Sequence, residues 1–169
     1  MRSLRSEPYD HRIAWLAALA LAIHVAESAL PSPLPGVKPG LANVITVAVL
    51  CLYGWRAAAW VSVLRVLAGG LVLGTFLSPT FLLSAAGAAA SLAVLWLAQF
   101  APGRGFGPLG YSVLAALGHM AGQFYLAYWV FIPHPALHAL LPILMTAAFV
   151  LGVANGIIAA AMLRRLARA

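Results

Sequence analysis

The sequence predicts an all-α integral membrane protein, and three observations lead to this fold class. Of the 169 residues, 64% are hydrophobic and 8% are charged, and the mean hydropathy is +0.99. A soluble domain carries about 25% charged residues, so too few polar side chains are present to cover a globule in water. Long apolar runs alternate with short segments rich in proline and glycine, which predicts a bundle of six transmembrane helices.

The first two predicted spans flank a segment that cannot form a regular helix. The spans cover about residues 13–30 and 41–53, and residues 31–40 between them include four prolines and two glycines. A span needs about 20 apolar residues. We therefore expect that the shorter second helix does not cross the bilayer alone as a straight helix of normal length.

Four further spans follow, each bounded by helix-breaking or helix-starting residues. They cover about residues 56–73, 79–100, 109–132 and 137–163. Ser78 and Pro79 are typical of a helix start, with serine as the cap and proline in the first turn. Residues 101–108 have the composition of a turn, and Pro133 and Pro135 end the fifth span.

The positive charges predict how the chain is oriented. Six spans place both termini on one side, where eight arginines would lie, whereas Lys38 would lie on the other side. Those arginines are Arg2, Arg5, Arg12, Arg56, Arg104, Arg164, Arg165 and Arg168. An excess of positive charge marks the cytoplasmic side. We expect a cytoplasmic segment at residues 1–12, one six-helix membrane domain at 13–163, and a basic cytoplasmic tail at 164–169.

Composition and motifs argue against several classes of function. The net charge of +7 comes from residues that form no basic stripe, so nucleic acid is not an expected partner. The chain has no GxxxxGK[ST] phosphate loop and therefore cannot be the ATPase of a pump. It has no HExxH motif, so we expect no metal site and no cofactor. Diphosphate chemistry with magnesium needs several carboxylates close together. The chain has three acidic residues, Glu7, Asp10 and Glu27, and of these only Glu27 lies in a predicted span. We expect no enzyme.

Two ionisable residues within predicted spans are the first candidates for a site. Arg65 lies midway along an apolar helix, where a charge costs about 2.5–3.5 kcal/mol even on a lenient insertion scale. Glu27 is the single carboxylate available inside a span. Such residues are functional by default, although a purely structural ion pair is the alternative.

Neutral polar residues and small residues provide further candidates. His119 and Gln123 share one helix face, and Asn43 and Ser84 lie on two other helices. Each has an alternative role in close packing or in interhelical hydrogen bonds. Small residues at a spacing of four form an alanine ladder on the first helix, consisting of Ala14, Ala18, Ala22 and Ala26. The ladder permits close approach of another helix, either inside this protein or from a partner.

Six short motifs, in chain order, carry a resemblance to a known family. They are Ile23-His-Val-Ala-Glu-Ser28, Leu34-Pro-Gly-Val-Lys38, Gly40-Leu-Ala-Asn43, Leu64-Arg-Val66, Ser84-Ala-Ala-Gly87 and Gly118-His-Met-Ala-Gly-Gln123. The chain resembles the bacterial Gx transporter family, also labelled heptaprenyl diphosphate synthase component I. Met120 stands where the family pattern has asparagine, so no role is carried over to that position. The synthase label conflicts with the scarcity of carboxylates. Because of that scarcity, we do not expect synthase activity.

The family in turn is similar to the substrate-binding (S) components of energy-coupling factor (ECF) importers. The resemblance implies a six-helix protein of the bacterial inner membrane that captures a vitamin, a cofactor precursor or another small molecule from outside. It also implies partners, namely a transmembrane coupling subunit and ATPase subunits. In S components the alanine ladder is the surface for the coupling subunit, and Ala14, Ala18, Ala22 and Ala26 match it.

Under this hypothesis, the substrate-binding residues are those of the polar helix faces. They are Glu27, Asn43, Arg65, Ser84, His119 and Gln123. Arg65 would meet an anionic group of the substrate, or pair with Glu27 in the empty pocket. A second hypothesis is a non-catalytic membrane accessory of isoprenoid or quinone biosynthesis. A third is a self-contained channel or carrier, which would support uptake into vesicles without nucleotide.

Overall fold

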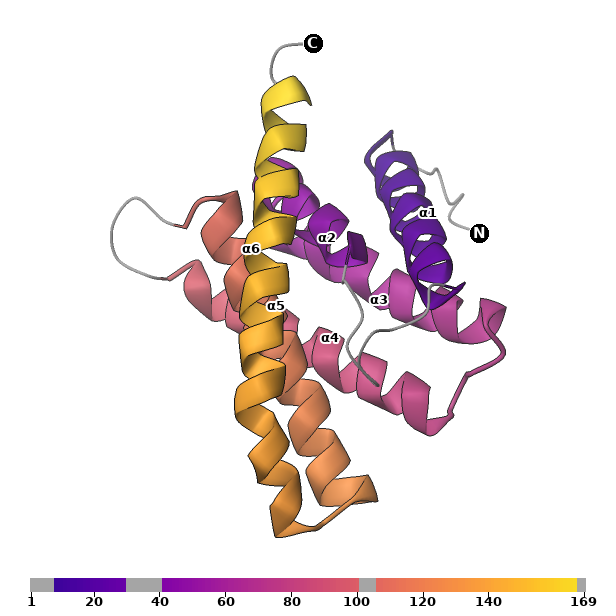
Figure 1. Ribbon diagram of the computed structural model, residues 1–169. Helices are drawn as coiled ribbons and strands as arrows, with labels where there is room; N and C mark the ends of the chain where they lie inside the picture. The colour runs from indigo at the N-terminus through magenta and orange to yellow at the C-terminus, as the bar shows by residue number, and fades with distance from the viewer. Residues whose placement is uncertain (1–7, 30–40, 101–105, 167–169) are drawn as a thin grey trace.

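Six α-helices make up most of the described chain, and each lies close to its predicted position (Figure 1). The computed structural model describes residues 8–29, 41–100 and 106–166. The helices are α1 (Pro8–Ala29), α2 (Leu41–Tyr53), α3 (Trp55–Val72), α4 (Pro79–Ala98), α5 (Pro108–Leu126) and α6 (Leu141–Leu166). The all-α class is confirmed. The predicted irregular segment at residues 31–40 lies outside the described residues, as do residues 101–105 of the loop predicted at 101–108.

Helix α2 lies at the centre of the bundle and contacts α1, α3, α5 and α6. Every residue from 43 to 50 is buried, because an apolar helix without a polar face is stable where neighbours cover it on all sides. The single residue Gly54 joins α2 to α3 with a φ of 84°, a value that favours glycine. The predicted short second helix is thus confirmed, and a tight turn joins it to the third.

The start of α4 has the predicted cap. The side chain of Ser78 accepts a hydrogen bond from the backbone N–H of Phe81 at 3.3 Å, and Pro79 occupies the first helical position. The hydroxyl thereby satisfies one of the backbone donors that a helix start leaves without a partner.

Small residues bring α4, α5 and α6 into close contact. A Cβ added at Gly122 on α5 would lie 2.6 Å from the carbonyl oxygen of Ala86 on α4. On the other side of α5, a Cβ added at Gly156 on α6 would lie 2.8 Å from Cα of Leu109. These approaches between backbones are typical of helix packing in membranes. The small residues of α6 are therefore used for packing inside the protein.

The connection between α5 and α6 differs from the predicted one. We expected a helix to residue 132, but the α-helix ends at Leu126 and continues as the π-helical segment η1 (Ala127–Phe131). Ile132 donates a backbone hydrogen bond to Ala127 at 2.8 Å and leaves the helical region, with φ −136° and ψ 74°. Proline disfavours α-helical geometry in the residue before it, and Pro133 follows. A 3-10 helix, η2 (Pro135–Leu140), then leads into α6.

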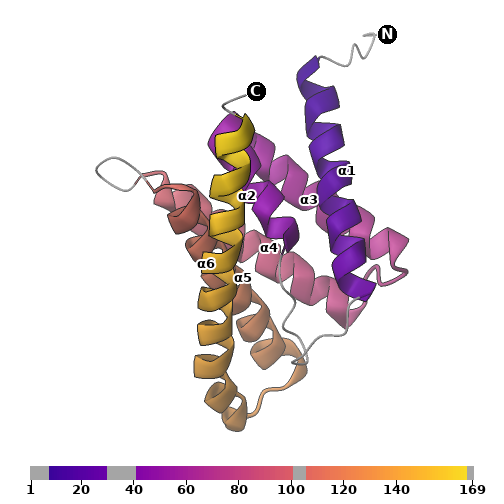
Figure 2. The same ribbon diagram turned by 45° about the horizontal axis from the view of Figure 1, so that its top comes forward.

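The ends of the helices have the arrangement that an even number of crossings requires. Helix α1 begins and α6 ends at the same end of the bundle, and the α2–α3 junction lies there too (Figures 1 and 2). The connection from α5 to α6 lies at the opposite end. Arg56 at the start of α3 and Arg164 and Arg165 in the last turn of α6 are exposed. The other charges used for the predicted orientation lie on residues whose side chains are outside the described part.

Within the described residues, three segments are long and apolar enough to cross a membrane, namely residues 55–72, 79–98 and 135–166. Two shorter apolar stretches, Ala14–Ala26 and Asn43–Tyr53, belong to α1 and α2. Long apolar helices of this kind are those of a membrane protein. The count of six spans stays a prediction.

Candidate functional site

Arg65 lies on the buried face of α3. Its side chain is 6% exposed, and Ser62, one turn earlier, is 2% exposed. Ala58 and Gly69 are buried on the same face, as the sequence spacing predicts. The charge of Arg65 is therefore held among helices and not at the outer surface of the bundle, where it would meet lipid. An intramembrane charge in this position points to a polar site.

Helix α1 places a histidine next to this face. The Cδ2 atom of His24 would lie 2.9 Å from a Cβ added at Gly69, and Gly69 lies one turn beyond Arg65. The absence of a side chain at position 69 thus makes room for the imidazole between α1 and α3. Glu27 follows His24 by one turn of α1, but its side chain lies outside the described part of the structure.

Helix α5 contributes a second histidine, which packs on α4. A Cβ at Gly87 would lie 2.8 Å from both Cε1 and Nε2 of His119 and 2.9 Å from Cγ of Gln123. The two predicted residues on α5 therefore share one glycine of α4. The Nδ1 atom of His119 is buried and has no hydrogen-bond partner among the described residues. Buried polar atoms are almost always satisfied, so this one indicates a missing partner.

Helix packing links these side chains into one cluster. Helix α3 packs on both α1 and α4, so the contact of His24 with the position of Gly69 and the contact of His119 with the position of Gly87 lie on adjoining helices. The structure thus gathers His24, Arg65, His119 and Gln123 from three helices, and we call them the polar cluster. Of the predicted site residues, it unites Arg65, His119 and Gln123.

The remaining predicted residues lie around the polar cluster in different ways. Ser84 is half-buried on α4, one turn before Gly87. Asn43 is buried in the first turn of α2, which contacts the helices that carry the polar cluster. His24 was not predicted as a site residue, although its spacing of three from Glu27 on one helix face could have indicated it.

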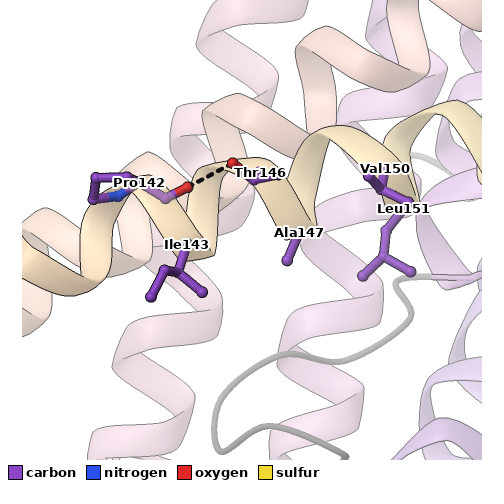
Figure 3. Close-up of a pocket in the computed structure, with 6 residues that line it drawn as sticks. All are labelled: Pro142, Ile143, Thr146, Ala147, Val150 and Leu151. Atoms are coloured by element: carbon purple, nitrogen blue, oxygen red, sulfur yellow. Dashed lines mark hydrogen bonds between the residues drawn. The ribbon is translucent and has the colours of Figure 1, made fainter.

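A surface cavity of the described part of the chain does not coincide with the polar cluster. It has a volume of about 600 Å³ and is an open apolar depression along a single helix, α6 (Figure 3). Its lining residues are Pro142, Ile143, Thr146, Ala147, Val150 and Leu151. Its one hydroxyl, on Thr146, donates a hydrogen bond to the carbonyl oxygen of Pro142 at 2.8 Å. A depression without free polar groups suits lipid chains better than a polar small molecule.

Aromatic rings gather where α5 leads into η1 and η2. The ring of His138 lies 4.5 Å from that of Tyr128 and 5.6 Å from that of Phe124, measured between centroids. Tyr125 and Trp129 are 5.5 Å apart, and Trp129 is 71% exposed. Exposed aromatic rings at a helix end are typical of the interfacial belt of a membrane protein.

The alanine ladder of α1 points away from the rest of the protein. All four residues, Ala14, Ala18, Ala22 and Ala26, are exposed, whereas Ala17 and Ala20 are buried. Trp15 and Leu19, beside the ladder, are 78% and 48% exposed. The described part of the chain therefore uses one face of α1 for packing and leaves the ladder face uncovered.

The apolar helices and the polar cluster between them define a helical membrane protein with an internal polar site. Residues 16–162 match the family described as heptaprenyl diphosphate synthase component I, and the chain belongs to that family. The predicted resemblance is thereby confirmed. No curated protein and no solved structure matches the chain.

Proposed function

We propose that the chain is the membrane-embedded substrate-binding component of an ECF-type importer. It would capture a vitamin, a cofactor precursor or another small molecule and would depend on a separate ATPase module. One observation carries the proposal: α1 has two differently used faces. One face brings His24 of the polar cluster to Gly69 on α3, and the other exposes Ala14, Ala18, Ala22 and Ala26.

The two faces suit the two tasks of such a component. A ladder of small residues allows another helix to approach closely, so that backbone and side chains pack over a long contact. Membrane helices gain no hydrophobic free energy from leaving lipid, so this packing decides their association. A partner helix on the ladder would thus act on the same helix that borders the site. Binding and coupling would then be linked through α1.

The proposal includes an orientation of the chain in the membrane. In the proposal the end with the start of α1, the α2–α3 junction and the end of α6 is cytoplasmic, because the exposed Arg56, Arg164 and Arg165 lie there. The substrate would enter from the opposite end, and the membrane would be the bacterial inner membrane. The chain itself would not be an enzyme, because one intramembrane carboxylate cannot hold magnesium for diphosphate chemistry.

Co-purification tests the proposal. The tagged chain, expressed in its native host and extracted gently, is expected to retain a transmembrane subunit and ATPase subunits, identified by mass spectrometry. Ala18→Leu and Ala22→Leu are expected to lose them, because a bulky side chain prevents close helix approach. Ala89→Leu and Ala93→Leu on α4 are the matched controls, because these alanines are also exposed and four residues apart. Absence of ATPases from the wild-type sample would overturn the proposal, and intact complexes in the ladder variants would overturn the role of the ladder.

A second candidate function has the family description in its favour. The chain would then be a non-catalytic membrane accessory to an enzyme of isoprenoid or quinone biosynthesis. Its test is direct: the activity of a prenyl diphosphate synthase should rise when the purified chain is added in vesicles. An importer component would leave that activity unchanged.

A further inference from the structure

We propose that the polar cluster binds an oxyanion, meaning a carboxylate or phosphate group of the substrate. The inference rests on the proposed function, because it assigns a substrate class to the site of that proposal. The side chains of the cluster have the chemistry that an oxyanion needs. Arg65 brings a permanent positive charge, His24 and His119 are imidazoles, and Gln123 has an amide that donates two hydrogen bonds.

The geometry concentrates these groups from three helices in one place. Arg65 is 6% exposed on α3, His24 reaches α3 from α1 at Gly69, and His119 lies over Gly87 between α5 and α4. Helix α3 packs on both α1 and α4, so the two histidine contacts lie on adjoining helices. Groups that tend to be positive repel one another, so their gathering away from water favours a negative group between them.

An atom without a partner supports the same conclusion. Nδ1 of His119 is buried with no hydrogen-bond partner among the described residues, while its Nε2 edge faces the position of Gly87. A neutral imidazole with a proton on Nδ1, or a charged one, would donate to an oxyanion there. A hydrogen bond that involves a charged group is about twice as strong as a neutral one, so this donor would add to the effect of Arg65.

Glu27 adds a competing charge on the same helix. It follows His24 by one turn of α1, and the chain has three acidic residues in all. If Glu27 pairs with Arg65 in the empty site, the pairing considered from the sequence, a bound oxyanion would compete with this carboxylate. Removal of the carboxylate should therefore act in the opposite direction to removal of Arg65.

The experiment is a thermal-melting assay of the purified chain in a phosphate-free maltoside detergent. The probes are sodium acetate, sodium phosphate and short-chain phosphatidic acid, each compared with sodium chloride at the same ionic strength. At least one oxyanion is expected to raise the melting temperature of the wild type, since a ligand that binds the native state stabilises it. Response to acetate or phosphate indicates a soluble substrate, whereas response to phosphatidic acid alone indicates a lipid headgroup.

The variants decide whether the polar cluster is responsible. Arg65→Gln is expected to lower the affinity for the probe that stabilises the wild type, by about tenfold or more. Arg56→Gln is the matched control, because Arg56 lies on the same helix but is exposed, and it should keep the wild-type response. His119→Gln replaces Arg65→Gln as the test if the latter does not insert. Equal responses in wild type and cluster variants, or no response to any oxyanion, would overturn the inference.

The outcomes separate this inference from the proposed function. If ATPases co-purify but the chain responds to no oxyanion, the importer role stands and the substrate class is wrong. If an oxyanion binds through Arg65 but no ATPase subunit is found, the site stands and the importer role fails.

Discussion

The imidazole of His119 on α5 lies against Gly87 on α4, so closely that a Cβ at position 87 would be 2.8 Å from both Cε1 and Nε2. Cβ atoms do not approach other heavy atoms to that distance without a shift of one of them. Gly87 therefore sets where His119 and its neighbour Gln123 can lie. The contact connects helix packing with the chemistry of the polar cluster.

Gly87→Ala should disturb the polar cluster. The added methyl group would displace the ring of His119 and the side chain of Gln123, which lies 2.9 Å away, so we expect a loss of the oxyanion-induced rise in melting temperature. Gly107→Ala is the control, because a Cβ there meets nothing within 4 Å. A Gly87→Ala protein with the full wild-type response would show that the position of His119 does not matter for binding.

Gly122→Ala should act on stability. A Cβ at Gly122 would lie 2.6 Å from the carbonyl oxygen of Ala86 and 2.6 Å from Cβ of Ala90. Neither atom belongs to a flexible side chain. The helices must separate, and overpacking of this kind costs about 1–3 kcal/mol. Thermal melting in detergent measures the loss, and Gly107→Ala should lose much less. Equal melting temperatures of the two variants would contradict the close packing of α4 on α5.

Ser78→Ala should weaken the start of α4. The hydroxyl accepts the hydrogen bond from the N–H of Phe81 at 3.3 Å, and loss of such a cap costs about 1 kcal/mol. Thr80→Ala provides the comparison, because Thr80 is exposed in the same first turn. A melting temperature lowered by roughly 2–4 °C in Ser78→Ala alone is the expected result. No difference between the two variants would mean that the cap contributes nothing.

Glu27→Gln should strengthen the binding of oxyanions. The substitution keeps the shape of the side chain but removes the negative charge of the residue three positions after His24 in α1. When acetate or phosphate is added in steps, the rise in melting temperature is expected to reach half its maximum at a lower concentration than in the wild type. A higher concentration would indicate that the carboxylate helps to hold the ligand, which then carries a positive or donor group.

Arg65→Ala separates a site from a structural ion pair. We expect the Arg65→Ala protein to insert into the membrane and to co-purify with its ATPase partners. It should retain no small molecule, as measured by native mass spectrometry. Arg65→Lys should keep part of the retention, because it keeps the charge without the planar guanidinium. If Arg65→Ala is degraded or fails to insert, whereas Arg56→Ala is normal, Arg65 is needed for folding.

Much of the fold could be predicted from the sequence, because the relevant forces are local. The apolar runs, the prolines and the Ser78 cap determine where helices begin and end, so α2 and α4 start at the predicted residues. The end of α5 was predicted less well. Pro133 indicates a break, but the change to π-helical geometry at Ala127 depends on how the chain turns into η2, which the local pattern does not reveal.

The sequence by itself determined that this is an apolar helical protein with a charge, Arg65, on one face of a helix. Spacing along a helix decides which residues share a face, and Ser62, Arg65 and Gly69 do share one. Only the tertiary structure decided that His24 lies at Gly69, that His119 lies at Gly87, and that the ladder of α1 points outward. The physical reason is that glycine and alanine permit close approach of any helix, so the choice of neighbour depends on how the whole bundle packs.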